Sequence, residues 1–456
     1  MGTGIPKTRW AKTIDGACIA YQDFGQGPLT LVVVHGWVSH LEIYWEQPRY
    51  VRFMRRLSRN LRVLVFDKRG TGMSDRFTQP PTLETRMEDL RAVMDTAGVE
   101  RAAIFAWGTG APPLGVLFAA TYPDRTLAVV VDGEVRLRSS PDYPCGFTED
   151  ELDESIAALT STWGDEDGAL EFVRRGYGDR PEDAPIGDEA FLRWNARLAR
   201  FSATPTSYEA FERMLFETDV TDVLPAVRVP SAVLYKTNDT AWSKPGAEYT
   251  SQRLSGCRLL AVPGEYQASV WWLDEPEACV SAIEGFLSSV RREEAELERV
   301  LATVVFTDIV GSTEKAAHLG DHEWKDLLDR HHAAIRGLLA RYRGVEVKTT
   351  GDGFLATFDG PARGVRCAQG ICEAVQGMGI EVRAGVHTGE IEMMGDDVGG
   401  LAVHIGARIA ALARPSEVLV SSTVKDLVAG CSLTFHNRGS HALKGVPGTW
   451  RLYAAT

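Results

Sequence analysis

The sequence contains no apolar run long enough to cross a lipid bilayer. The longest such run, Leu29–Val34, has the length of a single β-strand, whereas a membrane-spanning helix needs about 20 apolar residues. The N-terminal stretch MGTGIPKTRW also lacks the apolar centre of a secretory signal. We therefore expect no membrane insertion, no export and a cytoplasmic location.

Paired cysteines and an excess of positive charge are also missing. The seven cysteines are scattered and form no CxxC pair, which indicates reduced thiols rather than a disulfide framework or a zinc site. The formal net charge is −13, which argues against a nucleic-acid-binding surface. The sequence therefore predicts a protein of a reducing compartment with no nucleic-acid partner.

The chain has 456 residues, of which 44% are hydrophobic and 24% charged, so it predicts a globular protein of two or three domains. Within residues 1–287, apolar strands alternate with helical segments. The expected strands are Leu29–Val34, Leu61–Phe66, Ala102–Ala106, Ser231–Tyr235 and Arg258–Val262. This alternation is typical of an α/β fold with a mostly parallel sheet covered on both faces. Residues 136–223 are acidic with helical periodicity and predict an inserted helical cap.

A different pattern begins at residue 300. The run TVVFTDIVGST (303–313) predicts a buried strand that ends on Asp308 and then turns through Gly311, Ser312 and Thr313. The run VKTTGDGF (347–354) predicts a tight hairpin with Asp352 near its tip. If these segments are neighbours in one sheet, the carboxylates form a site for one or two divalent ions. The small-residue turn can then cradle phosphates.

With VRAGVHTGE (382–390), GDDVGGLAVHIGARI (395–409) and LKGVPGTWRLY (443–453), these motifs resemble the catalytic domain of class III nucleotidyl cyclases. The resemblance covers about the last third of the chain, with every motif in the family's order. It implies a ferredoxin-like α+β domain over residues 300–456, with helices over Glu314–Tyr342, Ala362–Met378 and Val403–Ala413. It also implies attack of a ribose 3′-hydroxyl on the α-phosphate, which releases pyrophosphate.

The same resemblance assigns the binding residues. Asp308 and Asp352, with the Ile309 carbonyl, would ligate two Mg²⁺ or Mn²⁺ ions per site. Lys348 and Asp397 match the pair that selects adenine, because lysine donates to the ring nitrogen N1 and the aspartate accepts the exocyclic amine. ATP is therefore the expected substrate and cyclic AMP the expected product.

Arg408 matches the cation that neutralises charge in the transition state. His404 stands where the family has an asparagine that orients the ribose, so activity is expected to be low, pH-sensitive or relaxed between ATP and GTP. Arg383 and Lys444 align with phosphate-contacting cations, or are ordinary surface charges.

Composite sites are implied as well. The family uses a dimer interface, so we expect an active homodimer and an inactive monomer. The residues expected from one protomer are Asp308, Asp352 and Arg383, and those from the other are Lys348, Asp397, His404, Arg408 and Lys444. His331 and His332 are expected to be ordinary residues of a helix face rather than ligands.

The N-terminal region resembles the α/β-hydrolase family, through HG at 35–36, DKRGTGMSD at 67–75 and PGEYQ at 263–267. The triad that this resemblance implies is degenerate. The nucleophile position falls on Gly108 or Thr109, the base position on Gln267, and the acid candidate Asp239 remains. Glycine offers no nucleophile and an amide accepts no proton, so hydrolysis is not expected.

Several interpretations remain open. The hydrolase-like domain is a scaffold, or its pocket binds a small apolar ligand and regulates the cyclase through a charged linker helix over residues 288–299. The candidate pocket aromatics are Trp37, Trp107, Trp271 and Trp272. Two alternatives for the whole chain are a nucleotide-binding sensor with an impaired cyclase site and an esterase with a regulatory cyclase domain.

Overall fold

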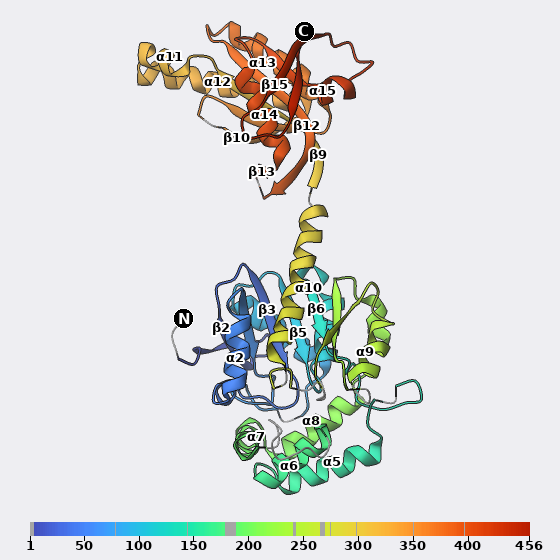
Figure 1. The fold of residues 1–456 in the computed structure, drawn as a ribbon. Coiled ribbons are helices and arrows are strands. Elements are labelled where there is room, and N and C mark those ends of the chain that lie inside the picture. The colour runs from blue at the N-terminus through green and yellow to red at the C-terminus, as the bar shows by residue number, and fades with distance from the viewer. Residues whose placement is uncertain are drawn as a thin grey trace. The chain divides into compact units, whose positions relative to one another are not determined.

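The computed structural model describes residues 4–77, 79–143, 145–177, 188–239, 243–264, 270–273, 275–297, 299–349, 351–395 and 397–456. It divides into two compact units, Met1–Val290 and Arg291–Thr456, each built on its own sheet (Figure 1). Among the described residues, no helix is long and apolar enough to cross a membrane.

The sheet of the first unit has eight strands in the order β1-β2-β4-β3-β5-β6-β7-β8. Its strands are β1 (Thr8–Lys12), β2 (Cys18–Phe24), β3 (Leu29–His35), β4 (Leu61–Phe66), β5 (Ala102–Trp107), β6 (Thr126–Val131), β7 (Ser231–Lys236) and β8 (Arg258–Val262). The pairs β1–β2 and β2–β4 are antiparallel, and the other neighbours run parallel. The predicted, mostly parallel sheet is confirmed.

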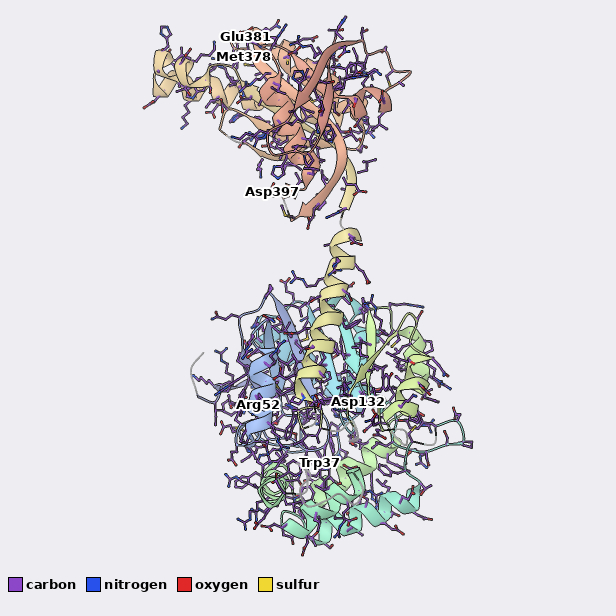
Figure 2. All side chains as sticks on the ribbon, in the orientation of Figure 1. Trp37, Arg52, Asp132, Met378, Glu381 and Asp397 are labelled. Carbon is purple, nitrogen blue, oxygen red and sulfur yellow. The ribbon has the colours of Figure 1, made fainter. Side chains whose placement is uncertain are left out.

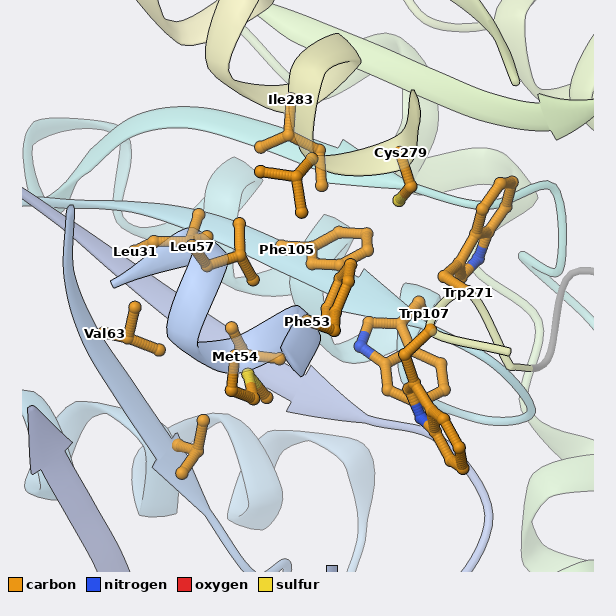
Figure 3. Packing of buried hydrophobic residues seen from close by; sticks show 14 of the residues in the cluster. Leu31, Phe53, Met54, Leu57, Val63, Phe105, Trp107, Trp271, Cys279 and Ile283 are labelled. Atoms are coloured by element: carbon orange, nitrogen blue, oxygen red, sulfur yellow. The ribbon is translucent and has the colours of Figure 1, made fainter. Parts of the chain in front are cut away.

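Helices cover both faces of this sheet. They are α1 (Leu41–Tyr44), α2 (Pro48–Leu57), α3 (Leu83–Thr96), α4 (Pro112–Thr121), α9 (Ser243–Ser251) and α10 (Pro276–Leu297), with 3-10 turns at Pro123–Arg125 and Thr221–Ala226. Figure 3 shows one face, where Phe53 and Met54 of α2 and Ile283 of α10 pack on Leu31 and Phe105 of the strands. Because both faces are covered, β5 and β6 are buried at every position.

Four cap helices are inserted between β6 and β7. They are α5 (Glu149–Ser161), α6 (Glu166–Tyr177), α7 (Glu189–Ser202) and α8 (Pro205–Glu217). A capping box starts α5, where the Thr148 hydroxyl accepts from the Glu151 N–H and the Glu151 side chain accepts from the Thr148 N–H. The helical cap predicted over 136–223 is therefore present.

The sheet of the second unit has the strand order β10-β11-β9-β12-β14-β16-β15, with β13 beside β12. Its strands are β9 (Arg299–Ile309), β10 (Val345–Thr349), β11 (Phe354–Phe358), β12 (Val382–Met394), β13 (Asp397–Gly399), β14 (Val418–Ser421), β15 (Phe435–Ala442) and β16 (Thr449–Ala455). Its helices are α11 (Ser312–Leu319), α12 (Asp321–Tyr342), α13 (Pro361–Gln376), α14 (Leu401–Leu412) and α15 (Ser422–Leu427). The first four strands, with α12 and α13, form the predicted ferredoxin-like β-α-β-β-α-β core.

Two helix predictions need correction. The single helix expected over Glu314–Tyr342 is wrong, because Gly320 separates α11 from α12 with φ 78° and ψ 164°, which no helix residue adopts. The charged segment 288–299 is not a separate helix: it begins inside α10, and β9 already starts at Arg299.

Candidate active site

The two predicted metal ligands come from neighbouring strands. Asp308 is the penultimate residue of β9, and Asp352 lies two residues before β11. Phe354 of β11 pairs with Thr307 of β9 in an antiparallel register, so one further step places Gly353 beside Asp308. Both aspartates are partly exposed. The sheet thus brings the two carboxylates to the same end of adjoining strands.

Arg383 on β12 lies directly opposite Asp308 in the β9–β12 ladder. Its Nε and Nη2 lie 3.0 Å and 2.5 Å from Asp308 Oδ2. The sequence predicted a phosphate contact for Arg383, whereas the structure pairs it with a predicted metal ligand. Ile309 next to Asp308 has a buried side chain, 2% exposed, which anchors the strand end in the core.

The small-residue turn after β9 leads straight into α11. Gly311 is the N-cap residue, with φ 64° and ψ 32°, and no side chain caps this helix. The first backbone N–H groups of α11, at Ser312 and Thr313, are therefore available to an anion. This geometry suits the phosphate cradle that the sequence predicted.

Lys348 and Asp397 form an ion pair within the chain. Lys348 Nζ lies 2.8 Å and 2.7 Å from the two carboxylate oxygens of Asp397. The hydrogen bond from Lys348 holds the pKa of Asp397 below its usual value. Asp397 Oδ1 also accepts from the Val398 N–H at 2.8 Å, so its carboxylate is oriented at the start of β13, where Figure 2 labels it.

His404 and Arg408 lie one turn apart on α14, and both are exposed. The Arg408 Nε donates to the backbone carbonyl of Lys444 at 3.1 Å, so the structure brings these two positions together. Helix α14 packs closely on the sheet because Gly406 has no side chain: a Cβ there would lie 2.8 Å from Val304 Cγ2 of β9.

The donor chemistry of this site fits a hard divalent cation. Asp308 and Asp352 offer carboxylate oxygens, which Mg²⁺ and Mn²⁺ prefer, and the remaining ligands can be phosphate oxygens and water. Among the described residues, no group of three or more His, Cys, Asp or Glu side chains could hold a metal alone.

Two histidines behind the Asp352 hairpin were treated in the sequence as ordinary helix residues. The His332 Nε2 lies 3.1 Å from the Gly351 carbonyl oxygen. The ring of His331 is fully buried, 0% exposed. Burial and the neighbouring His332 lower the pKa of His331 to about 4, while Asp352 opposes this shift.

The turn after β5 in the hydrolase-like unit contains both candidates for the nucleophile position, Gly108 and Thr109. Gly108 directly follows β5, has φ 77°, and is followed within four residues by α4. A sharp strand-to-helix turn with its strained residue at the tip is the geometry of a nucleophile elbow. Of the two candidate residues, Gly108 has the positive φ angle directly after the strand, and Thr109 follows it.

Backbone groups of the elbow form hydrogen bonds with neighbouring residues. The Gly108 N–H donates to Asp132 Oδ2 at 2.6 Å, and the Thr109 carbonyl accepts from the Trp37 N–H at 2.8 Å. Asp239 lies just past β7 and is 8% exposed. Gln267, at the base position, lies outside the described residues.

A small cavity lies between the sheet and the cap of this unit. It measures about 30 Å³ and is lined by three of the predicted aromatics, Trp37, Trp107 and Trp272, with Trp194 of the cap. Figure 2 shows Trp37 between the sheet and the cap helices. Trp271 instead lies in the core (Figure 3), and its Nε1 donates to Asp132 Oδ2 at 3.4 Å. This volume holds one or two water molecules.

The hydrolase-like unit also contains buried carboxyl groups, one of which, Asp132, contacts the elbow backbone. Burial raises the pKa of Asp132 and of Glu134, which oppose each other's ionisation. Burial also raises the pKa of Glu212 on α8 to about 7. Burial therefore favours the neutral form of each of these acids more strongly than water does.

Comparisons with known proteins match each unit separately. Residues 296–455 match the adenylate and guanylate cyclase catalytic domain, and residues 31–282 match the alpha/beta hydrolase family. A putative adenylate cyclase 3 from Rhizobium meliloti is 30% identical over 166 residues, 33% of this chain and 27% of that protein. The chain thus spans about a quarter of that cyclase's length.

The hydrolase-like unit has relatives of its own. A Karrikin insensitive 2 receptor CA from Petunia hybrida is 24% identical over 243 residues, 52% of this chain and 84% of that protein. The crystal structure of a bromoperoxidase from Bacillus anthracis has a TM-score of 0.53 and 20% identity, and the match covers 62% of this chain and 100% of that one. That likeness shows the fold alone.

Fold and matches together define a fusion of a hydrolase-fold domain with a nucleotidyl cyclase catalytic domain. The chain belongs to the alpha/beta hydrolase family, and its C-terminal third is a class III adenylate/guanylate cyclase domain.

Proposed function

We propose that this protein is an adenylate cyclase that converts ATP to 3′,5′-cyclic AMP and pyrophosphate. The observation that carries the proposal is the meeting of Asp308 and Asp352 at adjoining strand ends, in a domain that also holds the Lys348–Asp397 ion pair. Residues 300–456 form its catalytic domain, and residues 1–287 form a regulatory domain.

The carboxylates of Asp308 and Asp352, with the Ile309 carbonyl, would hold two divalent ions. When bound, these ions lower the pKa of the 3′-hydroxyl and hold the triphosphate. The N–H groups of Ser312 and Thr313 bind the phosphate oxygens at the start of α11. Charge in this reaction builds on non-bridging oxygens, so the Arg408 guanidinium stabilises the transition state by a charge-assisted hydrogen bond. His404, on the same helix face, orients the ribose.

Adenine is selected by Lys348 and Asp397. Lys348 has three donors and gives two contacts to Asp397, so one N–H remains for the adenine N1 acceptor. The Asp397 carboxylate accepts the exocyclic amine. Guanine presents a donor at N1 and an acceptor at C6, so it meets like groups at both positions.

The active species is a homodimer with composite sites. Exposed apolar side chains on β9, β12 and α14 support this arrangement: Leu301 is 68% exposed, Met394 52% and Leu401 51%. An apolar surface of this kind is costly unless a partner covers it. Complementation tests the dimer with Asp308→Ala and Arg408→Ala chains, each inactive alone. Mixed in equal amounts, they should regain about a quarter of the wild-type activity, because about half of the dimers are mixed and each mixed dimer has one intact site of two. Independent sites regain none.

The hydrolase-like domain acts by binding rather than by hydrolysis. Its support is Gly108 at the elbow, which offers no side chain for attack. The cavity lined by Trp37, Trp107 and Trp272 accepts a small apolar ligand once the cap moves. The petunia relative, 24% identical over 243 residues, is named as a receptor. A wild-type rate of ester hydrolysis that Thr109→Ala abolishes would contradict this assignment.

The deciding experiment measures cyclic nucleotide formation from ATP and GTP with Mn²⁺. Wild type is compared with Asp308→Ala and with Asp359→Ala, whose carboxylate pairs only with exposed Arg363 four residues along. Cyclic AMP that vanishes in Asp308→Ala and persists in Asp359→Ala supports the cyclase. Binding of ATP without product supports the second candidate, a nucleotide-binding sensor, which His404 in place of asparagine favours.

A further inference from the structure

We infer that His331 positions the metal ligand Asp352, by donating a ring N–H to the Asp352 carboxylate when the ion is bound. The inference rests on the proposed function, since it takes Asp352 as a ligand. It assigns a role to a buried side chain that the reaction itself does not use.

The first observation is an unpartnered imidazole. His331 is 0% exposed, and neither of its ring nitrogens has a hydrogen-bond partner among the described residues. Buried polar groups are rarely left unpaired, because they lose their hydrogen bonds to water and no protein hydrogen bond compensates for that free energy. A leucine at this position of α12 would fill the core without that cost. The histidine therefore needs a partner in another state of the site.

The second observation is the hairpin that packs against it. The His332 Nε2 is within hydrogen-bond distance of the Gly351 carbonyl, at 3.1 Å. The Phe354 ring lies edge-on to both imidazoles, with centroids 6.1 Å from His331 and 5.1 Å from His332. Gly351 and Phe354 flank Asp352 in the sequence. The two histidines thus pack against the segment that carries Asp352.

The chemistry selects Asp352 as the partner. A carboxylate that binds an ion through one oxygen keeps lone pairs free, and such ligands are oriented by donors behind them. A neutral imidazole supplies one N–H donor. Direct ligation by His331 is disfavoured because Mg²⁺ prefers oxygen. His331 is therefore a positioning residue, one hydrogen bond behind the metal.

The test compares stability with metal affinity in the full-length chain. His331→Leu removes both nitrogens but keeps an apolar side chain of fitting size. His331→Asn keeps a donor. Leu327→Ala, one turn earlier on the buried face of α12, is the control for packing alone. Mn²⁺ affinity is measured by electron paramagnetic resonance with a non-cyclising ATP analogue, and the unfolding temperature by calorimetry.

We expect His331→Leu to weaken Mn²⁺ binding about tenfold or more, the usual effect of losing such a donor, without lowering the unfolding temperature. His331→Asn should restore part of the affinity. Leu327→Ala should lower the unfolding temperature and leave Mn²⁺ affinity unchanged. Unchanged Mn²⁺ affinity in His331→Leu would overturn the inference. A loss of Mn²⁺ affinity accompanied by a matching fall in the unfolding temperature would also overturn it.

Two further measurements keep the outcomes separate. Asp352→Asn is titrated alongside: if it binds Mn²⁺ as wild type does, Asp352 is not a ligand and the inference is wrong. If both variants bind weakly while wild type makes no cyclic nucleotide, the cyclase proposal fails and the inference stands. If His331→Leu does not fold, ¹⁵N nuclear magnetic resonance spectra of the histidine ring nitrogens in the wild-type protein test the inference instead. A His331 N–H signal that does not respond to Mg²⁺ with the analogue contradicts the inference.

Discussion

The guanidinium of Arg383 lies across one strand pair from Asp308 and contacts its Oδ2 through both Nε and Nη2, at 3.0 Å and 2.5 Å. The pair is about one-third exposed on each side, 34% and 36%, so it contributes about 1 kcal/mol at most. A divalent ion can therefore displace it. In the proposed function, Arg383 would neutralise Asp308 until the ion arrives and would then be free to contact phosphate.

This relationship predicts opposite effects of Arg383→Gln on binding and on turnover. Mn²⁺ affinity without nucleotide should rise about fivefold, because about 1 kcal/mol of competing attraction is removed. Cyclic nucleotide turnover should fall about tenfold or more, because a charge-assisted phosphate contact is lost. Calorimetric titration and product assays measure the two effects. Arg363→Gln, which removes an exposed pair with Asp359, is the control, and weaker Mn²⁺ binding in Arg383→Gln would contradict the account.

Base selection should follow Lys348. In Lys348→Glu, the ion pair with Asp397 becomes a repulsion, and an acceptor faces the base where a donor stood. The ratio of kcat/KM for ATP to that for GTP should fall about tenfold or more, since adenine N1 is left facing an acceptor. Competition assays with both nucleotides measure the ratio. An unchanged ratio with a lowered overall rate would assign Lys348 to structure alone.

His404→Asn should raise turnover several-fold without changing the unfolding temperature. The side chain is exposed on α14, so its replacement leaves the core intact, and the amide restores the donor and acceptor pair expected beside the ribose. Steady-state rates with ATP test this prediction. His318→Asn on α11, also exposed, controls for the loss of a histidine. A lower rate in His404→Asn would show that the histidine has a role of its own.

Stability of the hydrolase-like unit should fall as pH rises from about 4.5 to 7. Burial raises the pKa of Glu212 from 4.5 to about 7, so the folded state binds a proton that the unfolded state has already released in this window. Stability is fully present below the unfolded value and is lost as pH rises, by about 3 kcal/mol for this shift. Glu212→Gln should flatten the pH dependence of unfolding by that amount. Glu209→Gln, whose side chain on the same helix is 45% exposed, should not. An equal slope in wild type and Glu212→Gln would contradict the assignment.

The sequence predicts most of the fold because the apolar runs are strong. Leu61–Phe66 and Arg258–Val262 are strands with the expected ends, since turn residues bound them on both sides. The division of the long helix at Gly320 was missed because an isolated glycine in a helical pattern is usually tolerated. The helix ends there because of the backbone φ angle of Gly320, which the amino-acid composition of the segment does not reveal.

The candidate site could be predicted as a set of positions but not as a set of contacts. Motif spacing brings Asp308 and Asp352 to one sheet end, because antiparallel register is regular. The partner of Arg383 depends on which strand lies opposite, so sequence alone assigned it to phosphate. His331 carries no sequence signal that separates it from a core residue, and only its unpartnered burial distinguishes it.

Gly108 keeps the turn of an enzyme without the side chain that would act there. A serine at φ 77° stores strain of about 1–3 kcal/mol, which enzymes retain for the sake of reactivity. Glycine adopts the same angle freely, and its N–H is held by Asp132. Glycine at this position therefore leaves the turn free of the strain that a side chain would add.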